Sequence, residues 1–163
     1  MIYHSLHLKG NDLVNRGFEL KEIRFIIKSK LEYVALVGMS VKKICSLTSF
    51  SEKQVFLIEL CVVEAINNSI IHAYKGESIY EVELSLSINK DHLFLKVSDK
   101  GKPMGTDILE NTNPISISIN RRSDDPLKLS ETGRGLGLIK ETMDKVTYGS
   151  DTLGNHLTMI KYF

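Results

Sequence analysis

Residues 55–74, VFLIELCVVEAINNSIIHAY, are the stretch that decides the fold. The segment is apolar on more than one face, which is typical of a helix that is packed on two sides. A strand is the weaker alternative, because strands rarely exceed about ten residues. Just before it, Ser51-Glu52-Lys53-Gln54 has the spacing of a capping box, and Lys75-Gly76 comes directly after it. The sequence therefore predicts a central, buried helix that begins after Ser51 and stops near Tyr74.

The patterns on either side of this helix predict a mixture of helices and antiparallel strands. They indicate a strand at 18–27 whose phase changes at Lys21-Glu22, by a bulge or a register break, and a helix at 31–47 behind a capping-box spacing at Ser29–Glu32. Further along they indicate a hairpin at 79–98, a helix at 138–146, and a last hairpin of 146–148 and 157–162 around a turn at 149–154. Helices and strands come in blocks instead of strict βαβ alternation. We therefore predict an α+β fold, a two-layer α/β sandwich whose mixed, mostly antiparallel sheet is covered by helices on one face.

Composition narrows the class of protein. The chain has 163 residues, 42% of them hydrophobic, which predicts one domain with a substantial core. Its 21 Lys and Arg and 20 Asp and Glu leave a net charge of +1, so there is no overall attraction to nucleic acid or to an anionic membrane. Two cysteines, Cys45 and Cys61, are too few for a disulfide framework or a four-cysteine zinc site.

The expected organisation is simple. Residues 1–16 are polar and predict an N-terminal extension, and residues 17–163 predict a single domain. Residues 105–132 have weak periodicity, which favours a functional lid. No apolar segment has the length of a signal peptide or of a membrane span, so we expect a soluble, cytoplasmic protein.

Polar residues interrupt the central helix at Glu64, Asn67, Asn68 and His72. Glu64 and Asn68 are four residues apart and share a helix face. A carboxylate and an amide oxygen one turn apart can address a water or hydroxyl and a hard cation together. The alternative is a polar face turned to solvent.

Two further clusters carry chemistry. Asp99 ends a predicted strand, where it can accept a hydrogen bond from an amine, and Gly101 lets a flat ligand approach the backbone; an Asx turn is the alternative. The run 133–137, Gly-Arg-Gly-Leu-Gly, opens a helix, where free N–H groups attract anions. It is neither a Walker A loop nor a Rossmann fingerprint, and a loosely packed helix start is the alternative. Together with the Glu64–Asn68 face, these clusters predict a nucleotide site.

With these residues the sequence resembles the GHKL (Bergerat-fold) ATPases. Glu64-Ala65-Ile66-Asn67-Asn68 with Ile71-His72-Ala73 is similar to their N box, Asp99-Lys100-Gly101 to the first glycine box, and Gly133-Arg134-Gly135-Leu136-Gly137-Leu138 to the second. Within that superfamily the sequence most resembles the anti-sigma-factor serine/threonine kinase (RsbW-like) family. One departure is that Asn155 comes after Gly154, where the superfamily commonly has Thr, so we assign no adenine contact there.

The resemblance implies a role for each of these residues. Glu64 would be the general base and Asn68 the ligand of Mg²⁺, while Asp99 would accept the adenine amino group, with Gly101 permitting close approach. The remaining nucleotide-binding residues would be His72, Gly133, Arg134, Gly135, Leu136 and Gly137. Arg134 would touch the γ-phosphate or point to solvent.

The resemblance also implies an activity and partners. The protein would be an ATP-dependent serine/threonine kinase of a partner-switching system that sequesters a sigma factor or analogous effector. Its substrate would be an anti-anti-sigma protein, phosphorylated on Ser or Thr. A homodimer is a family expectation, whereas no direct contact with nucleic acid or membrane is expected. The alternative function is a non-catalytic ATP-binding module that holds a protein partner.

Overall fold

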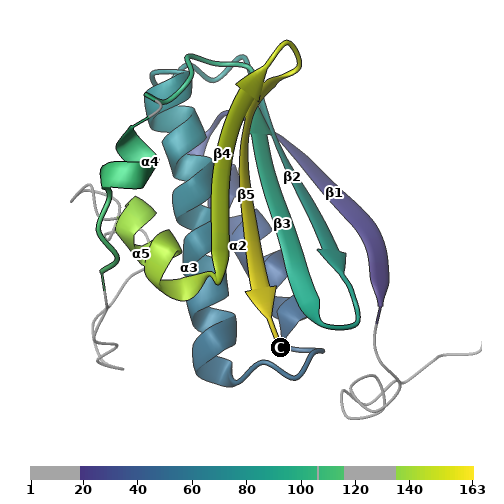
Figure 1. Ribbon diagram of the computed structural model, residues 1–163. Helices are drawn as coiled ribbons and strands as arrows, with labels where there is room; N and C mark the ends of the chain where they lie inside the picture. The colour runs from purple at the N-terminus through teal and green to yellow at the C-terminus, as the bar shows by residue number, and fades with distance from the viewer. Residues whose placement is uncertain (1–18, 106, 116–134) are drawn as a thin grey trace, which may run out of the picture.

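The structure, a computed structural model, describes residues 19–105, 107–115 and 135–163 (Figure 1). Its elements in chain order are β1 (Leu20–Lys28), α2 (Leu31–Cys45), α3 (Glu52–Asn68), the π-helical turn η1 (Ser69–Ala73), β2 (Glu81–Ile88), β3 (His92–Asp99), α4 (Ile108–Asn111), α5 (Gly135–Thr142), β4 (Lys145–Asp151) and β5 (Gly154–Tyr162). The expected extension at 1–16, most of the expected lid, Gly133 and Arg134 lie outside the described residues.

The five strands form one sheet in the order β1-β2-β3-β5-β4, and the helices lie on one of its faces (Figure 1). This confirms the predicted two-layer α+β sandwich. Every pair of neighbouring strands is antiparallel, so the described sheet is antiparallel throughout. The β1–β2 register shifts between Leu20 and Ile23, which confirms the irregularity expected at Lys21-Glu22.

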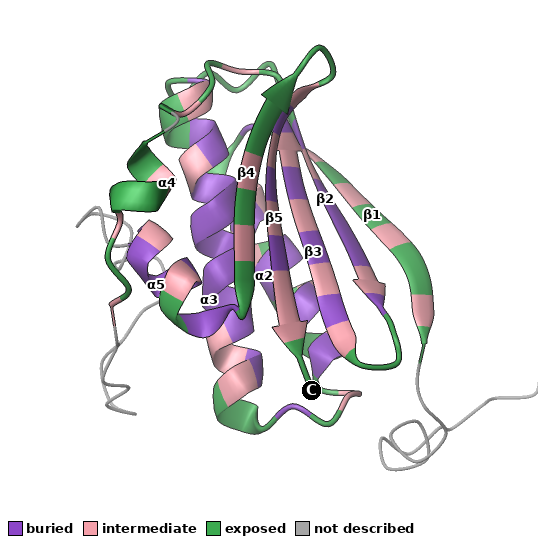
Figure 2. Ribbon diagram, in the orientation of Figure 1, coloured by how far each residue is buried: buried purple, intermediate pink, exposed green. Residues whose placement is uncertain are grey.

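The core lies between the sheet and α3. The strands turn alternate side chains to the helices, namely Val82, Leu84, Leu86 and Ile88 of β2, Leu93, Leu95 and Val97 of β3, and Leu157 and Met159 of β5. Figure 2 shows this alternation along the strands and the concentration of buried residues in α3. Asp99 and Asn155 are in phase with these core residues, so they lie on the helix-facing side of the sheet.

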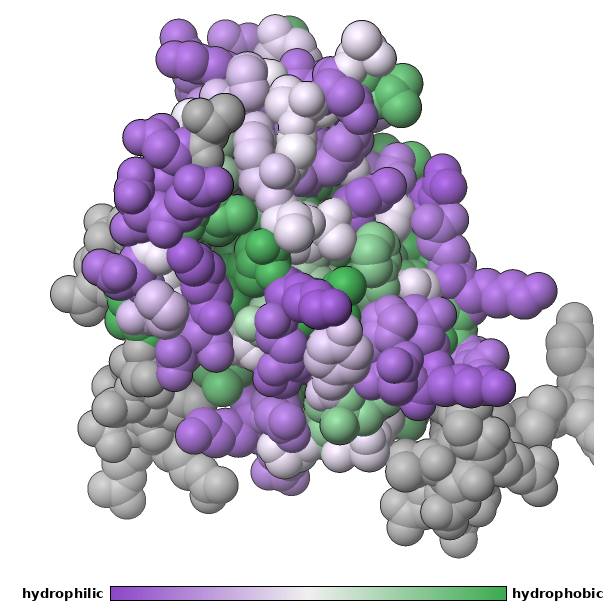
Figure 3. Space-filling view, in the orientation of Figure 1, coloured by the Kyte–Doolittle hydropathy of each residue, from purple (hydrophilic) through white to green (hydrophobic). Residues whose placement is uncertain are grey.

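Helix α3 and the turn η1 confirm the predicted central helix, with Tyr74 as its C-cap. The stretch Glu52–Ala73 is long and apolar enough to cross a membrane by composition, but 72% of its most apolar window is buried inside the domain. Hydrophilic side chains cover most of the face in Figure 3. The stretch is therefore the core helix of this domain.

Helix α2 packs closely against α3 because Gly38 has no side chain. A Cβ on Gly38 would lie 2.9 Å from Cγ2 of Val63. One turn further along α2, the Lys42 ammonium lies 2.8 Å from the buried Glu59 carboxylate. Lys42 thereby compensates a charge that is otherwise costly to bury in the helix pair.

Three local expectations were wrong. Ser29 does not cap α2, because its hydroxyl donates to the distant Glu77 carbonyl, and the N-cap is Lys30 with no side-chain bond. Helix α5 ends at Thr142 instead of 146, since β5 pairs with the residues after it: the Asp144 N–H donates to the Ile160 carbonyl, 2.9 Å away. The last turn is shorter than expected, with β4 reaching Asp151 and β5 beginning at Gly154.

The capping box at Ser51 is present and predicts a measurable stability effect. The Ser51 hydroxyl accepts from the Gln54 N–H, and the Gln54 side chain accepts from the Ser51 N–H. We expect Ser51→Ala to lower the free energy of unfolding by about 1 kcal/mol, measured by urea denaturation. Ser46→Ala, which removes an exposed hydroxyl after α2, is the control and should change stability by less than about 0.5 kcal/mol. Equal losses in the two variants would contradict the cap assignment.

Candidate functional site

The carboxylate of Asp99 is held by three donors from three parts of the chain. Its Oδ2 accepts from the Ser69 hydroxyl at 2.8 Å, and its Oδ1 accepts from the Gly101 N–H at 2.9 Å and from the Asn155 amide at 2.7 Å. Ser69, Asp99 and Asn155 are each more than nine-tenths buried. The bond from Gly101 forms the Asx-type turn that was the alternative interpretation of Asp99, but the other two donors come from η1 and β5.

Asn155, like Ser69, is a residue of this network to which the sequence patterns assigned no role. It stands directly opposite Asp99 in the β3–β5 register. Besides donating to Asp99, its amide donates to the Gly101 carbonyl at 3.0 Å. The phase of Leu157 and Met159 in the alternating pattern was a usable signal, because it places Asn155 on the same side as Asp99.

Gly101 packs against the end of the central helix. A Cβ there would lie 2.5 Å from the Ala73 carbonyl oxygen, and the next N–H, that of Lys102, donates to this oxygen at 2.9 Å. The neighbouring Tyr74 hydroxyl accepts from the Lys100 N–H and donates to the Glu81 carbonyl. Burial raises the pKa of Tyr74, so this hydroxyl stays protonated as the donor that the second bond requires.

Glu64 is buried in the last third of α3, which excludes the alternative of a solvent-facing carboxylate. Only 3% of the residue is exposed, and its Oε1 has no hydrogen-bond partner among the described residues. This burial raises the pKa of the Glu64 carboxyl. A Cβ on Gly135 would collide with the same carboxylate, so only glycine lets the first turn of α5 come this close.

Asn68 lies one turn after Glu64 and is partly exposed, but its Nδ2 is buried without a partner in the part of the chain that the structure describes. The α-helix changes to the π-helical turn η1 immediately after it. Such turns occur often at functional sites. His72 lies in η1 and is exposed, so the structure does not bring it to the buried group around Asp99.

The described part of the glycine run is the first turn of α5. Gly135 faces Glu64, and a Cβ on Gly137 would lie 2.8 Å from the Asn113 carbonyl oxygen. Leu136, between them, packs against the core. The Lys140 ammonium donates to the Leu109 carbonyl of α4 at 2.9 Å, which ties the two short helices together.

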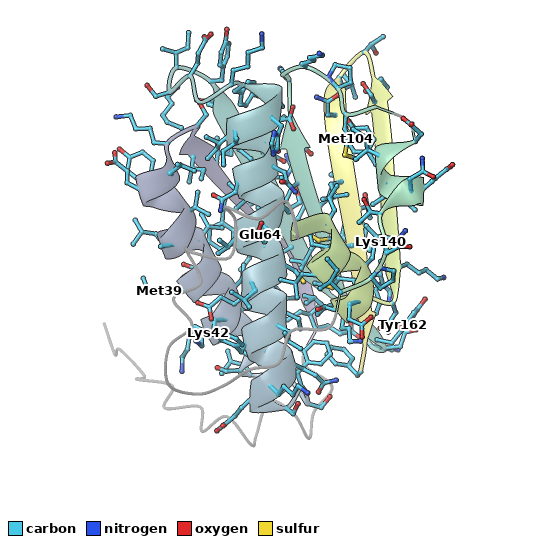
Figure 4. The ribbon with its side chains drawn as sticks, turned by 90° about the vertical axis from the view of Figure 1, so that its left-hand side faces the viewer. Met39, Lys42, Glu64, Met104, Lys140 and Tyr162 are labelled. Atoms are coloured by element: carbon cyan, nitrogen blue, oxygen red, sulfur yellow. The ribbon has the colours of Figure 1, made fainter. Side chains whose placement is uncertain are left out.

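Helix α3 connects these groups into one site. Glu64, in the last third of α3, lies beside Gly135. Five residues further, at the start of η1, Ser69 donates to Asp99, and five residues of an α-helix span about 7.5 Å. Figure 4 shows Glu64 on α3, with Met104 and Lys140 to one side of the helix and Met39 and Lys42 to the other. The structure therefore brings together Glu64, Asn68, Asp99, Gly101, Gly135 and Asn155 along one helix.

This arrangement of a polar core helix, a buried strand-end Asp and a glycine-started helix defines a class of ATPase domain. The sequence profile of the histidine kinase-like ATPase domain matches residues 27–161. The serine-protein kinase RsbW of Listeria innocua is 33% identical over 141 residues, which are 86% of this chain and 87% of that protein. The same-named protein of Oceanobacillus iheyensis is 28% identical over 142 residues, covering 86% and 85%. The chain belongs to the histidine kinase-like ATPase (GHKL) family and, within it, to the RsbW-like anti-sigma-factor serine kinases.

Burial of Glu64 predicts how stability depends on pH. Because folding raises the pKa of this carboxyl, the folded protein holds the proton more tightly than the unfolded chain does. The protonated Glu64 carboxyl therefore favours the folded state below the unfolded pKa of about 4.3, and this stabilisation is lost as the pH rises through the higher pKa of the folded state. We expect Glu64→Gln to be more stable than the wild type at pH 8, by a margin that shrinks towards pH 4, measured by urea denaturation across this range.

The control for this measurement is Glu77→Gln, which changes an exposed carboxylate. Because this side chain is exposed, its replacement should change the free energy of unfolding by less than about 0.5 kcal/mol. A wild type that is as stable as Glu64→Gln at pH 8 would contradict the buried, unpartnered carboxylate.

Proposed function

We propose that this protein is an ATP-dependent serine/threonine protein kinase that phosphorylates an anti-anti-sigma protein. One observation carries the proposal: the buried Glu64 carboxylate has an oxygen without a described partner and lies against the first turn of α5. A helix N-terminus attracts phosphate. A base beside a phosphate-binding helix start is the arrangement that transfer to a hydroxyl requires.

In the proposed reaction the oxygen of the substrate hydroxyl attacks the γ-phosphorus of ATP. Glu64 accepts the hydroxyl proton as the new P–O bond forms, and ADP leaves with the electrons of the bond that breaks. Burial raises the pKa of Glu64, which brings its basicity closer to neutral pH and favours proton acceptance. The α5 N–H groups hold the phosphates, and the absence of a side chain on Gly135 leaves the base beside them.

Asn68 and Asp99 would hold the two ends of the nucleotide. Mg²⁺ prefers oxygen ligands, and Asn68 would supply its amide oxygen one turn from Glu64. The buried Nδ2 of Asn68, which lacks a described partner, could donate to a phosphate oxygen. The metal would neutralise charge on the phosphates. At the other end, Asp99 would accept the amino group of adenine, since a carboxylate can accept more than the three bonds it receives here.

The proposed partners rest on the family. The relatives are serine-protein kinases of the RsbW type, so we propose an anti-anti-sigma protein as substrate, a sigma factor or analogous effector as sequestered partner, and a cytoplasmic location. A homodimer is proposed on the same resemblance alone. The chain's net charge of +1 supports regulation through proteins instead of direct nucleic-acid binding.

The test of the kinase uses Glu64→Gln, which keeps the size of the side chain but cannot accept the proton. With Mg-ATP and an anti-anti-sigma protein from the same organism, we expect phosphotransfer to fall at least about 100-fold. ATP binding, measured by titration with a fluorescent analogue, should change by less than about threefold. Transfer is measured by incorporation of labelled phosphate, with Glu77→Gln as the control.

Two results would count against the kinase. Undiminished transfer by Glu64→Gln would remove Glu64 as the base. Stable partner binding by the wild type, with the nucleotide intact after long incubation, would favour the non-catalytic ATP-binding module.

The role of Asn68 is tested through the metal. In Asn68→Ala we expect the Mg²⁺ concentration that gives half-maximal phosphotransfer to rise about tenfold, because one oxygen ligand is lost. The control Asn89→Ala removes an exposed amide in the β2–β3 turn and should leave the Mg²⁺ titration unchanged. An unchanged titration for Asn68→Ala would assign the metal to other ligands.

A further inference from the structure

The Asp99 carboxylate has little capacity left for a ligand. A carboxylate offers about four acceptor positions, two on each oxygen. Oδ1 already accepts from the Gly101 N–H and the Asn155 amide, and Oδ2 accepts from the Ser69 hydroxyl. The structure thus leaves one acceptor position, on Oδ2, for a donor from outside the protein.

The Asn155 amide is fixed by its own partners. Its Nδ2 lies 2.7 Å from Oδ1 of Asp99 and 3.0 Å from the Gly101 carbonyl oxygen, and both partners are acceptors. Both N–H bonds of the amide are therefore used, and the reverse orientation would place its oxygen against two other oxygens. Because Asn155 is 3% exposed, this donor cannot be replaced by water without rearrangement.

The backbone around Asn155 holds this arrangement in place. Gly154 has φ of +133°, and a Cβ there would collide with the Asp99 carbonyl, so the start of β5 fits against the end of β3 only with glycine. On the other side of the carboxylate, the Ser69 hydroxyl comes from η1. Hydrogen bonds from both sides therefore hold the Asp99 carboxylate in one orientation.

We propose that Asn155 is a positioning residue that limits Asp99 to one external N–H donor and thereby selects adenine over guanine; this inference rests on the proposed nucleotide site. Adenine presents a single donor group, its amino group, beside a ring acceptor. The corresponding edge of guanine presents two adjacent donors, the ring N–H and the amino group, which a carboxylate binds best with both oxygens. Asn155 takes one of the two acceptor positions of Oδ1, so Asp99 has no free position on each oxygen for the two guanine donors.

The test compares Mg-ATP with Mg-GTP on the full chain. Asn155→Leu keeps a similar volume and removes both donors, whereas Asn155→Thr keeps a single hydroxyl donor. We measure the dissociation constants by competition against a fluorescent ATP analogue and express selectivity as the GTP constant divided by the ATP constant. We expect this ratio to be high in the wild type, about tenfold lower in Asn155→Leu, and intermediate in Asn155→Thr.

Thr158→Val is the matched control, since it removes a hydroxyl from the same strand without contact to Asp99. It should leave the ratio unchanged. Melting temperatures without nucleotide separate a loss of fold from a loss of selectivity, and a purely structural role for Asn155 would weaken both nucleotides in parallel. If Asn155→Leu does not fold, the test rests on Asn155→Thr. A GTP-to-ATP ratio that is at least about threefold lower than in the wild type supports the proposal, and an unchanged ratio overturns it.

The outcomes distinguish this inference from the proposed function. If the wild type binds ATP and a folded Asn155→Leu has the same ratio of GTP to ATP dissociation constants, only the selectivity role of Asn155 is overturned. A wild type that binds GTP as well as ATP also overturns it. A wild type that binds neither nucleotide overturns both proposals, whereas a shifted ratio without any phosphotransfer supports the role of Asn155 and removes only the kinase.

Discussion

The site depends on one constraint: a carboxylate as buried as that of Asp99 is costly unless hydrogen bonds satisfy it. Its donors come from η1, from the segment after β3 and from β5. Satisfying this one charge therefore joins the end of the central helix to the middle of the sheet. Since α3 runs without interruption into η1, the same bonds also determine where Asn68 and Glu64 stand relative to Asp99.

Glu64 and Asn68 differ from Asp99, because their buried polar atoms are not all hydrogen-bonded in the described part of the chain. Each has a buried polar atom without a partner among the described residues, although most buried polar groups in native proteins are hydrogen-bonded. An unpartnered buried group destabilises the protein without its ligand, and a hydrogen bond from a bound ligand offsets that cost. The fold thus satisfies most of the Asp99 carboxylate and leaves it one acceptor position, whereas the unpartnered atoms of Glu64 and Asn68 are both available to a ligand.

Much of the fold was predictable from the sequence because the hydrophobic periods are local. The strand alternation, the register shift in β1 and the end of the central helix were all predicted. The errors came where a residue with a local sequence signal forms its hydrogen bond with a distant segment instead. Ser29 has capping-box spacing, but its hydroxyl donates to Glu77, 48 residues away. The helix expected to reach 146 ends early because the carboxylate of Asp144 accepts from Tyr162 in β5. No local pattern contains those partners.

The candidate site was predictable for a related reason, and only in part. A helix with apolar residues on two faces has no side left for solvent, so a carboxylate in its middle must meet either a partner or a ligand. For Glu64 the alternative of a solvated face thus conflicts with the same periodicity that predicts the helix. Asn155 was identifiable by its phase in β5, but its role was not, since that depends on how many donors already occupy Asp99. A pattern can place a side chain on a face, whereas only coordinates can count its partners.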